Sequence, residues 1–147
     1  MLKVLIVDDE AVVRRGIVLG IDWASLGCAV VGEAANGEQA LAVAEDCQPT
    51  LIITDLKMPK MDGLEMVRRL REAGSRAYVI ILTAYDSFAY AQTAIRLGAV
   101  DFLLKPFHDG DLENAVLALQ KRIAAQTAPQ PGPLPGVKPG PKSRYVR

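Results

Sequence analysis

The chain has 147 residues, of which 50% are hydrophobic and 23% are charged, a composition typical of a globular domain and unlike that of a disordered chain. Its 17 basic and 17 acidic residues balance, and it contains one histidine and two cysteines, which exclude a multi-histidine metal centre and a disulfide scaffold. No apolar run approaches the ~18 residues of a membrane span, and the N-terminus lacks a signal-peptide pattern, so we expect a cytoplasmic protein with reduced thiols and no membrane partner.

Charge is distributed unevenly along the chain. Residues 1–113 contain all 17 acidic residues and 11 of the 17 basic ones, a net charge of −6. Residues 114–147 contain the other six basic residues and no acid. An acidic body repels a phosphate backbone and so disfavours direct binding of nucleic acid. The scattered basic residues near the C-terminus are a weak signal for such binding.

Short apolar runs bounded by turn residues predict five β-strands. In chain order they are Leu2–Val7, Cys28–Glu33, Leu51–Thr54, Ala77–Leu82 and Val100–Leu104.

The segments between these runs have helical spacing of apolar residues. Asn36 and Asp62 are each followed three residues later by Gln39 or Glu65, which is the pattern of a capping box at a helix start. The five expected helices run from near Glu10 to Leu19, from Asn36 to before Pro49, onward from Asp62 through Leu70, from Ser87 to Leu97 with Gly98 as the stop, and over Asp111–Ala125.

Strands that alternate with helices indicate an α/β fold, in which a parallel five-stranded sheet is doubly wound with five helices on its two faces. Residues 1–125 are expected to form this one domain. Residues 126–147 contain six of the nine prolines, which neither a helix nor a central strand tolerates, and they are expected to be a disordered basic tail or linker.

Polar residues stand at the ends of four predicted strands. Asp8 and Asp9 follow the first, Asp55 the third, Thr83 the fourth and Lys105 the fifth. Right-handed crossovers bring these strand ends to one edge of the sheet, where such folds bind ligands. Each residue alone would be an ordinary cap or turn, but three carboxylates, a hydroxyl and an ammonium gathered at one edge favour a site. Clustered carboxylates need a compensating cation, and Mg²⁺ with a phosphoryl group fits these ligands.

The motifs that carry these residues resemble those of the receiver domain of bacterial two-component response regulators. They are VDDE at 7–10, TDLKMPKMDG at 54–63, LTAY at 82–85 and LLKPF at 103–107, and the resemblance covers residues 2 to about 124. It implies a CheY-like, flavodoxin-type fold with the strand order 2-1-3-4-5.

The resemblance also implies a role for each site residue. Asp55 would be the phosphoacceptor, and the chain a regulatory phosphoacceptor that assists its own phosphorylation and dephosphorylation rather than an enzyme. The other implied roles are Mg²⁺ ligation by Asp8, Asp9, Asp55 and the Lys57 backbone carbonyl, switching by the Thr83 hydroxyl and the Phe102 ring, phosphate binding by Lys105, and a cis bond between Lys105 and Pro106.

A sensor histidine kinase would supply the phosphoryl group. The face formed by the fourth helix, fifth strand and fifth helix would then change, with a homodimer as one consequence. Residues 21–41 and 85–107 resemble receivers joined to AraC-type DNA-binding domains. We therefore expect transcriptional control, with DNA contacted only through an output domain absent from this chain.

Two alternatives remain open. A stand-alone receiver would act by protein contact. A small Mg²⁺-dependent phosphatase with an aspartate nucleophile would share the chemistry, but it would need a second acid two residues after Asp55, where Lys57 stands. A nucleotide-binding domain is disfavoured because Asp8 and Asp9 stand where a glycine-rich turn is needed.

Several other residues have simpler interpretations. Cys28, Cys47 and Trp23 are expected to be packing residues, and His108 a loop residue. Lys57 and Tyr85 are expected to flank the site entrance and to influence the lifetime of the phosphoryl group.

Overall fold

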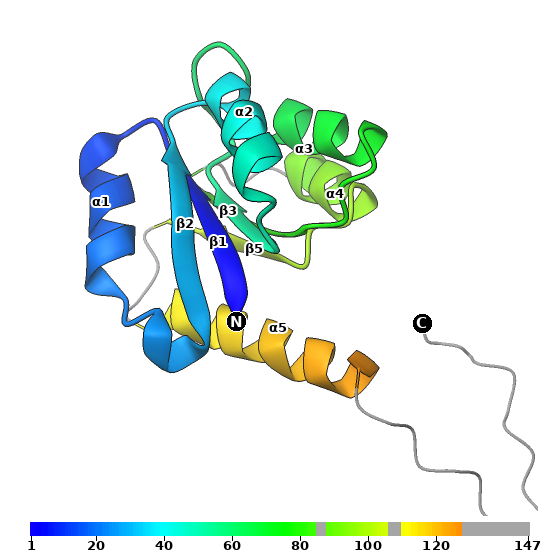
Figure 1. Cartoon of the computed structure of the whole chain (residues 1–147). Helices are drawn as coiled ribbons and strands as arrows, with labels where there is room; N and C mark the ends of the chain where they lie inside the picture. The colour runs from blue at the N-terminus through cyan, green and yellow to red at the C-terminus, as the bar shows by residue number, and fades with distance from the viewer. Residues whose placement is uncertain (85–87, 106–109, 128–147) are drawn as a thin grey trace, which may run out of the picture.

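The computed structural model describes residues 1–84, 88–105 and 110–127. Five parallel strands form one sheet in the order β2-β1-β3-β4-β5 (Figure 1). This confirms the predicted fold class and strand order. The strands are β1 (Leu2–Val7), β2 (Cys28–Ala34), β3 (Leu51–Thr54), β4 (Tyr78–Thr83) and β5 (Asp101–Leu104).

Helices cover both faces of this sheet. On one face α2, α3 and α4 share a core with strand residues such as Leu5, Ile52 and Ile81. On the other face α1 and α5 share a second core with residues such as Ile6 and Ile80. The helices are α1 (Ala11–Gly20), α2 (Gly37–Cys47), α3 (Gly63–Glu72), α4 (Phe88–Arg96) and α5 (Asp111–Thr127), with a 3₁₀ turn, η1 (Ala24–Leu26), before β2.

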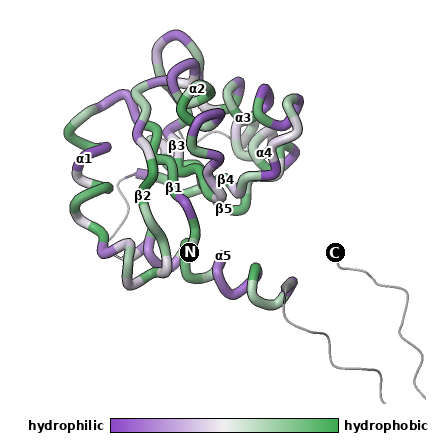
Figure 2. Tube along the Cα trace, viewed as in Figure 1, coloured by the Kyte–Doolittle hydropathy of each residue, from purple (hydrophilic) through white to green (hydrophobic). Residues whose placement is uncertain are grey.

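The central strands are apolar throughout because they are buried on both faces. All four residues of β3 are buried. In Figure 2 the strands are coloured mostly as hydrophobic, while hydrophobic and hydrophilic residues alternate along α5. Successive side chains of a strand point to opposite faces, so β1 gives Leu5 and Val7 to one core and Val4 and Ile6 to the other.

Side-chain caps start two of the helices at the predicted residues. Asn36 Oδ1 accepts from the Gln39 N–H at 2.8 Å, and Asp62 Oδ1 accepts from the Glu65 N–H at 2.8 Å. The reciprocal half of the capping box differs from the expectation. Gln39 Oε1 accepts from Ala35 N–H, one residue before the cap, at 2.6 Å, while the Glu65 carboxylate pairs with Arg68 and Arg69.

Element ends differ from the expectation by one or two residues. β4 begins at Tyr78 because the Ala77 carbonyl accepts from Arg71 Nη1 at 2.7 Å instead of joining the sheet. α5 continues two residues beyond Ala125 to Thr127, since no proline interrupts it there. α4 ends at Arg96, one residue before the predicted Leu97, and the turn that follows it contains Gly98, whose φ of 87° suits glycine.

The predicted packing residues lie inside. Trp23 is 6% exposed and its Nε1 donates to the Ile17 carbonyl at 3.3 Å. Cys28 is buried and Cys47 is half-buried. Among the helices in the described ranges, none is long and apolar enough to cross a membrane.

Candidate functional site

The register of the central strands sets the predicted polar residues side by side. Val7 of β1 pairs with Thr54 of β3, so the next residue of each strand, Asp8 and Asp55, comes at the same edge of the sheet. Asp8 N–H donates to the Ala34 carbonyl at 3.0 Å and Asp55 N–H to the Val7 carbonyl at 2.9 Å. These bonds carry the ladder one step beyond the strands and hold both aspartates on rigid backbone.

Three carboxylates meet at this edge. Asp8, Asp9 and Asp55 each offer an oxygen, and these oxygens lie within 4.8 Å of one another. Asp8 is 2% exposed and Asp55 9% exposed, whereas Asp9 faces solvent. Oxygens at this spacing, partly open to water, are the donor set that a hard divalent cation prefers.

Lys105 follows β5, the last strand of the sheet, and brings a positive charge to two of the carboxylates. Its Nζ lies 3.0 Å from Asp8 Oδ2 and 3.3 Å from Asp55 Oδ2. Thr83 ends β4, is fully buried, and its carbonyl accepts from the Lys105 N–H at 2.7 Å. The side chains predicted from four strand ends therefore belong to one edge of the sheet.

Burial and neighbouring charges shift the pKa values of two groups at the site. It raises the pKa of Asp55, and the Asp8 charge raises it further, although the Leu56 N–H and Lys105 favour the ionised form. Burial alone would lower the pKa of Lys105, but the carboxylates of Asp8 and Asp55 outweigh it and raise that pKa. Lys105 therefore stays charged, while ionised Asp55 is costly until a further cation approaches.

Comparison with known proteins identifies the family. The profile of the response regulator receiver domain matches residues 4–117. The chain belongs to this family.

Relatives of this receiver include transcriptional regulators and single receiver domains. It is 35% identical over 126 residues to the uncharacterized transcriptional regulatory protein YesN of Bacillus subtilis, covering 83% of this chain and 34% of YesN. It is 42% identical to the receiver domain of AraT, a response regulator from Geobacillus stearothermophilus, with a TM-score of 0.78, covering 85% of this chain and 97% of that one. A chain of the CheX–CheY–BeF3–Mg complex from Borrelia burgdorferi is 26% identical with a TM-score of 0.74, covering 81% and 89% of the two chains. The receiver thus spans about a third of the curated relative YesN.

Two further predicted residues lie outside the carboxylate cluster. Phe102 in β5 is half-buried and packs against the core shared by α2, α3 and α4. Lys57 is exposed in the loop after β3, and its Nζ lies 5.1 Å from the centre of the Tyr90 ring in α4. Pro106, and with it the predicted cis bond, lies outside the described residues, as do Tyr85 and His108.

A second network around Asp8 was not anticipated from the sequence. Arg14 Nη1 donates to the Asp8 carbonyl at 2.5 Å, and Arg14 Nε lies 3.1 Å from Glu33 Oε1. Asp8 Oδ1 also accepts from the Glu10 N–H at 2.9 Å, while Glu10 itself precedes α1 as expected. A signal was present: Arg14 lies one helical turn beyond the acidic loop, and Glu33 lies near the end of the neighbouring strand.

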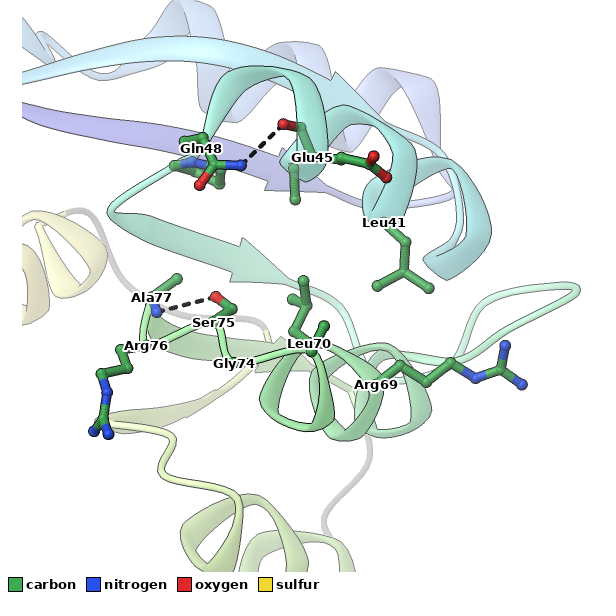
Figure 3. A pocket seen from close by; sticks show the side chains of 12 residues that line it. Leu41, Glu45, Gln48, Arg69, Leu70, Gly74, Ser75, Arg76 and Ala77 are labelled. Carbon is green, nitrogen blue, oxygen red and sulfur yellow. Dashed lines mark hydrogen bonds between the residues drawn. The ribbon is translucent and has the colours of Figure 1, made fainter.

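A cavity of about 700 Å³ lies at the opposite edge of the sheet, between the C-terminal ends of α2 and α3 and the start of β4 (Figure 3). Leu41 and Leu70 face it, with Glu45 and Arg69 at its rim. Asp8, Asp9 and Asp55 do not line it.

Proposed function

We propose that this receiver accepts a phosphoryl group on Asp55 from a sensor histidine kinase, with Mg²⁺ as the required cofactor. The observation that carries the proposal is the position of the Asp55 carboxylate, which lies 3.3 Å from Lys105 Nζ and within 4.8 Å of the carboxylate oxygens of Asp8 and Asp9. A carboxylate placed beside cationic groups is a suitable nucleophile for phosphorus.

The residues present fit Mg²⁺. Asp8, Asp9 and Asp55 offer oxygen ligands, and the Lys57 backbone carbonyl is proposed as a further one. A bound Mg²⁺ would neutralise the charge that develops on the transferred phosphoryl oxygens. The related CheX–CheY–BeF3–Mg complex supports this assignment.

The chemistry on this chain is one displacement. An Asp55 oxygen attacks the phosphorus of phosphohistidine, a P–O bond forms, and the P–N bond breaks as its electron pair returns to the imidazole. Lys105, already 3.3 Å from Asp55 Oδ2, then holds a phosphoryl oxygen as a charge-assisted donor. The Thr83 hydroxyl is proposed to bind another.

The output is proposed to follow from the movement of Thr83 toward the phosphoryl group and of Phe102 into the space it leaves. The face formed by α4, β5 and α5 would change as a population shift, and a swing from 1:99 to 99:1 requires ~5.5 kcal/mol of differential binding. This face carries exposed apolar side chains on each element, namely Ile95, Leu104 and Leu117, which suits a homodimer.

Transcriptional control is the proposed use of the switch, because the relative YesN is named a transcriptional regulatory protein. DNA contact would come from an output domain beyond residues 1–125, with 126–147 as the linker, in the cytoplasm. A stand-alone receiver that acts by protein contact is the alternative. A phosphatase is disfavoured, because Lys57 stands where its second acid is needed.

The test is the intact mass of the protein after incubation with acetyl phosphate and Mg²⁺. We expect one phosphoryl adduct in the wild type and none in Asp55→Asn or in the presence of EDTA. Beryllofluoride titration is the matched measurement, because it needs the site but no donor. A wild type that forms no adduct and binds no beryllofluoride contradicts the proposal.

A further inference from the structure

The backbone carbonyl of Asp55 is enclosed by two residues to which the reaction above assigns no role. Thr54, the last residue of β3, is 0% exposed, and its Oγ1 donates to the Asp55 carbonyl at 2.8 Å. Thr54 lies two residues after Ile52, so it faces the same apolar core as that side chain. A hydroxyl buried among apolar groups requires a partner, and here the partner is the main chain of the phosphoacceptor.

Gly63 closes the other side of the same carbonyl. It is the first residue of α3, and a Cβ there would lie 2.2 Å from the Asp55 carbonyl oxygen and 3.3 Å from Leu56 Cα. Both neighbours are backbone, so nothing flexible can give way. Gly63 is not among the glycines with positive φ. This position therefore requires glycine for space, because the start of α3 is pressed against the Asp55–Leu56 peptide.

That peptide determines how the Asp55 carboxylate points. The Leu56 N–H belongs to the same peptide group as the Asp55 carbonyl, and it donates to Asp55 Oδ1 at 2.6 Å. Since a peptide group is planar, fixing the carbonyl also fixes the direction of this N–H. Oδ1 is thereby held against the backbone, and Oδ2 is left facing Lys105 Nζ.

We propose that Thr54 and Gly63 are positioning residues for the phosphoacceptor: together they fix the plane of the Asp55–Leu56 peptide and so aim the carboxylate at the incoming phosphorus. The inference rests on the proposed function for its kinetic consequence. Its structural consequence, the orientation of the Leu56 N–H, stands independently of phosphorylation.

A matched pair of variants separates the hydroxyl from the packing of Thr54. Thr54→Val keeps the shape and removes the donor, whereas Thr54→Ser keeps the donor and removes a methyl group. With acetyl phosphate and saturating Mg²⁺, we expect the maximal rate of Asp55 phosphorylation to fall about tenfold or more in Thr54→Val. The donor concentration at half-maximal rate should be unchanged, and Thr54→Ser should stay within about threefold of the wild type.

The NMR resonance of the Leu56 amide tests the geometry without any donor. The proton should lie downfield in the wild type and in Thr54→Ser, as a short charge-assisted bond requires, and move upfield in Thr54→Val. Gly63→Ala should shift the same resonance, but the Thr54 pair decides the question if that variant does not fold.

The inference is overturned if Thr54→Val reacts at the wild-type rate with the Leu56 amide unmoved. It is also overturned if both Thr54 variants slow equally with equal losses of melting temperature, since packing alone would then explain them. A wild type without phosphorylation refutes the proposed function instead. The Leu56 resonance then decides whether Thr54 fixes the peptide.

Discussion

Asp55 pays an electrostatic cost for its position. Burial raises the pKa of its carboxyl, and the neighbouring Asp8 charge adds to this. A raised pKa in the folded state means that the unfolded state releases the proton more readily. The protonated Asp55 carboxyl therefore contributes fully to the stability of the folded state below the ordinary pKa of aspartate. This contribution disappears as the pH rises through the raised pKa of Asp55.

Removing this charge should stabilise the metal-free protein. At pH 7 with EDTA, we expect Asp55→Asn to unfold at a higher temperature than the wild type. The difference between the two unfolding temperatures should narrow as the pH falls toward the ordinary pKa of aspartate. It should also narrow when Mg²⁺ is added, because a ligand that binds the native wild type stabilises it. Asp46→Asn, at an exposed site on α2, is the control and should change little. A difference independent of pH would refute the electrostatic origin.

The sequence could predict those site residues that their immediate neighbours in the chain mark, and it could not predict those that depend on tertiary contacts. Asp8, Asp55, Thr83 and Lys105 each follow an apolar run, and parallel strands end at one edge, so their meeting could be predicted. Arg14 and Glu33 meet across 19 residues of sequence, and that contact depends on how α1 crosses the sheet. Thr54 reads as one more residue of a buried strand until its hydroxyl is seen on the Asp55 carbonyl.

At the scale of elements, the loop after β3 is tied to α4. Lys57 Nζ stands 5.1 Å from the centre of the Tyr90 ring, and such a contact is worth about 0.5–1 kcal/mol at an exposed site. Lys57 comes two residues after Asp55, so this contact joins the loop that follows Asp55 to α4, the helix expected to switch.

Releasing that contact should shorten the life of the phosphoryl group. Lys57→Met and Tyr90→Leu should each speed the loss of phosphoryl from Asp55 about two- to fivefold, the equivalent of the contact energy. Tyr90→Phe keeps the ring and should match the wild type. The decay is followed by intact mass after the donor is removed. Equal decay in Tyr90→Leu and Tyr90→Phe would show that the ring does not act through Lys57.

Element existence could be predicted from the sequence far better than element ends. All five strands and five helices follow from apolar runs, helical spacing and caps such as Asn36. The start of β4 could not be predicted, because it depends on Arg71, a residue of another element that takes the Ala77 carbonyl out of the ladder. α5 runs two residues beyond the predicted Ala125, although the sequence carries a signal for this, because the first proline after the helix is Pro129.

At the scale of the whole molecule, the carboxylate site lies at the edge of the sheet where the strands end. The proposed output surface is the face formed by α4, β5 and α5. Ile95 of α4 is 68% exposed, and Leu104 of β5 and Leu117 of α5 are each 42% exposed. We expect the proposed switch to align these three side chains into an apolar strip that a second copy can bury.

A charge in that strip should prevent association. With beryllofluoride and Mg²⁺ we expect the wild type to sediment as a dimer, and without them as a monomer. Ile95→Glu should raise the dimer dissociation constant at least about tenfold, because the new carboxylate would be buried without a partner. Leu19→Glu on α1, where Leu19 is 72% exposed, should dimerise like the wild type. A wild type that stays monomeric under both conditions contradicts the dimer.

The strand order also bears on how the chain is made. β1 lies between β2 and β3, and its residue Val7 pairs with Thr54, which follows it by 47 residues. At a synthesis rate of about 5–20 residues per second, the ribosome needs roughly 2 to 9 s to produce that partner after β1 has been made. Throughout this interval the apolar segment LKVLIV has unpaired backbone on at least one edge. The order of the strands therefore leaves this segment open to pairing with another chain until β3 has been made.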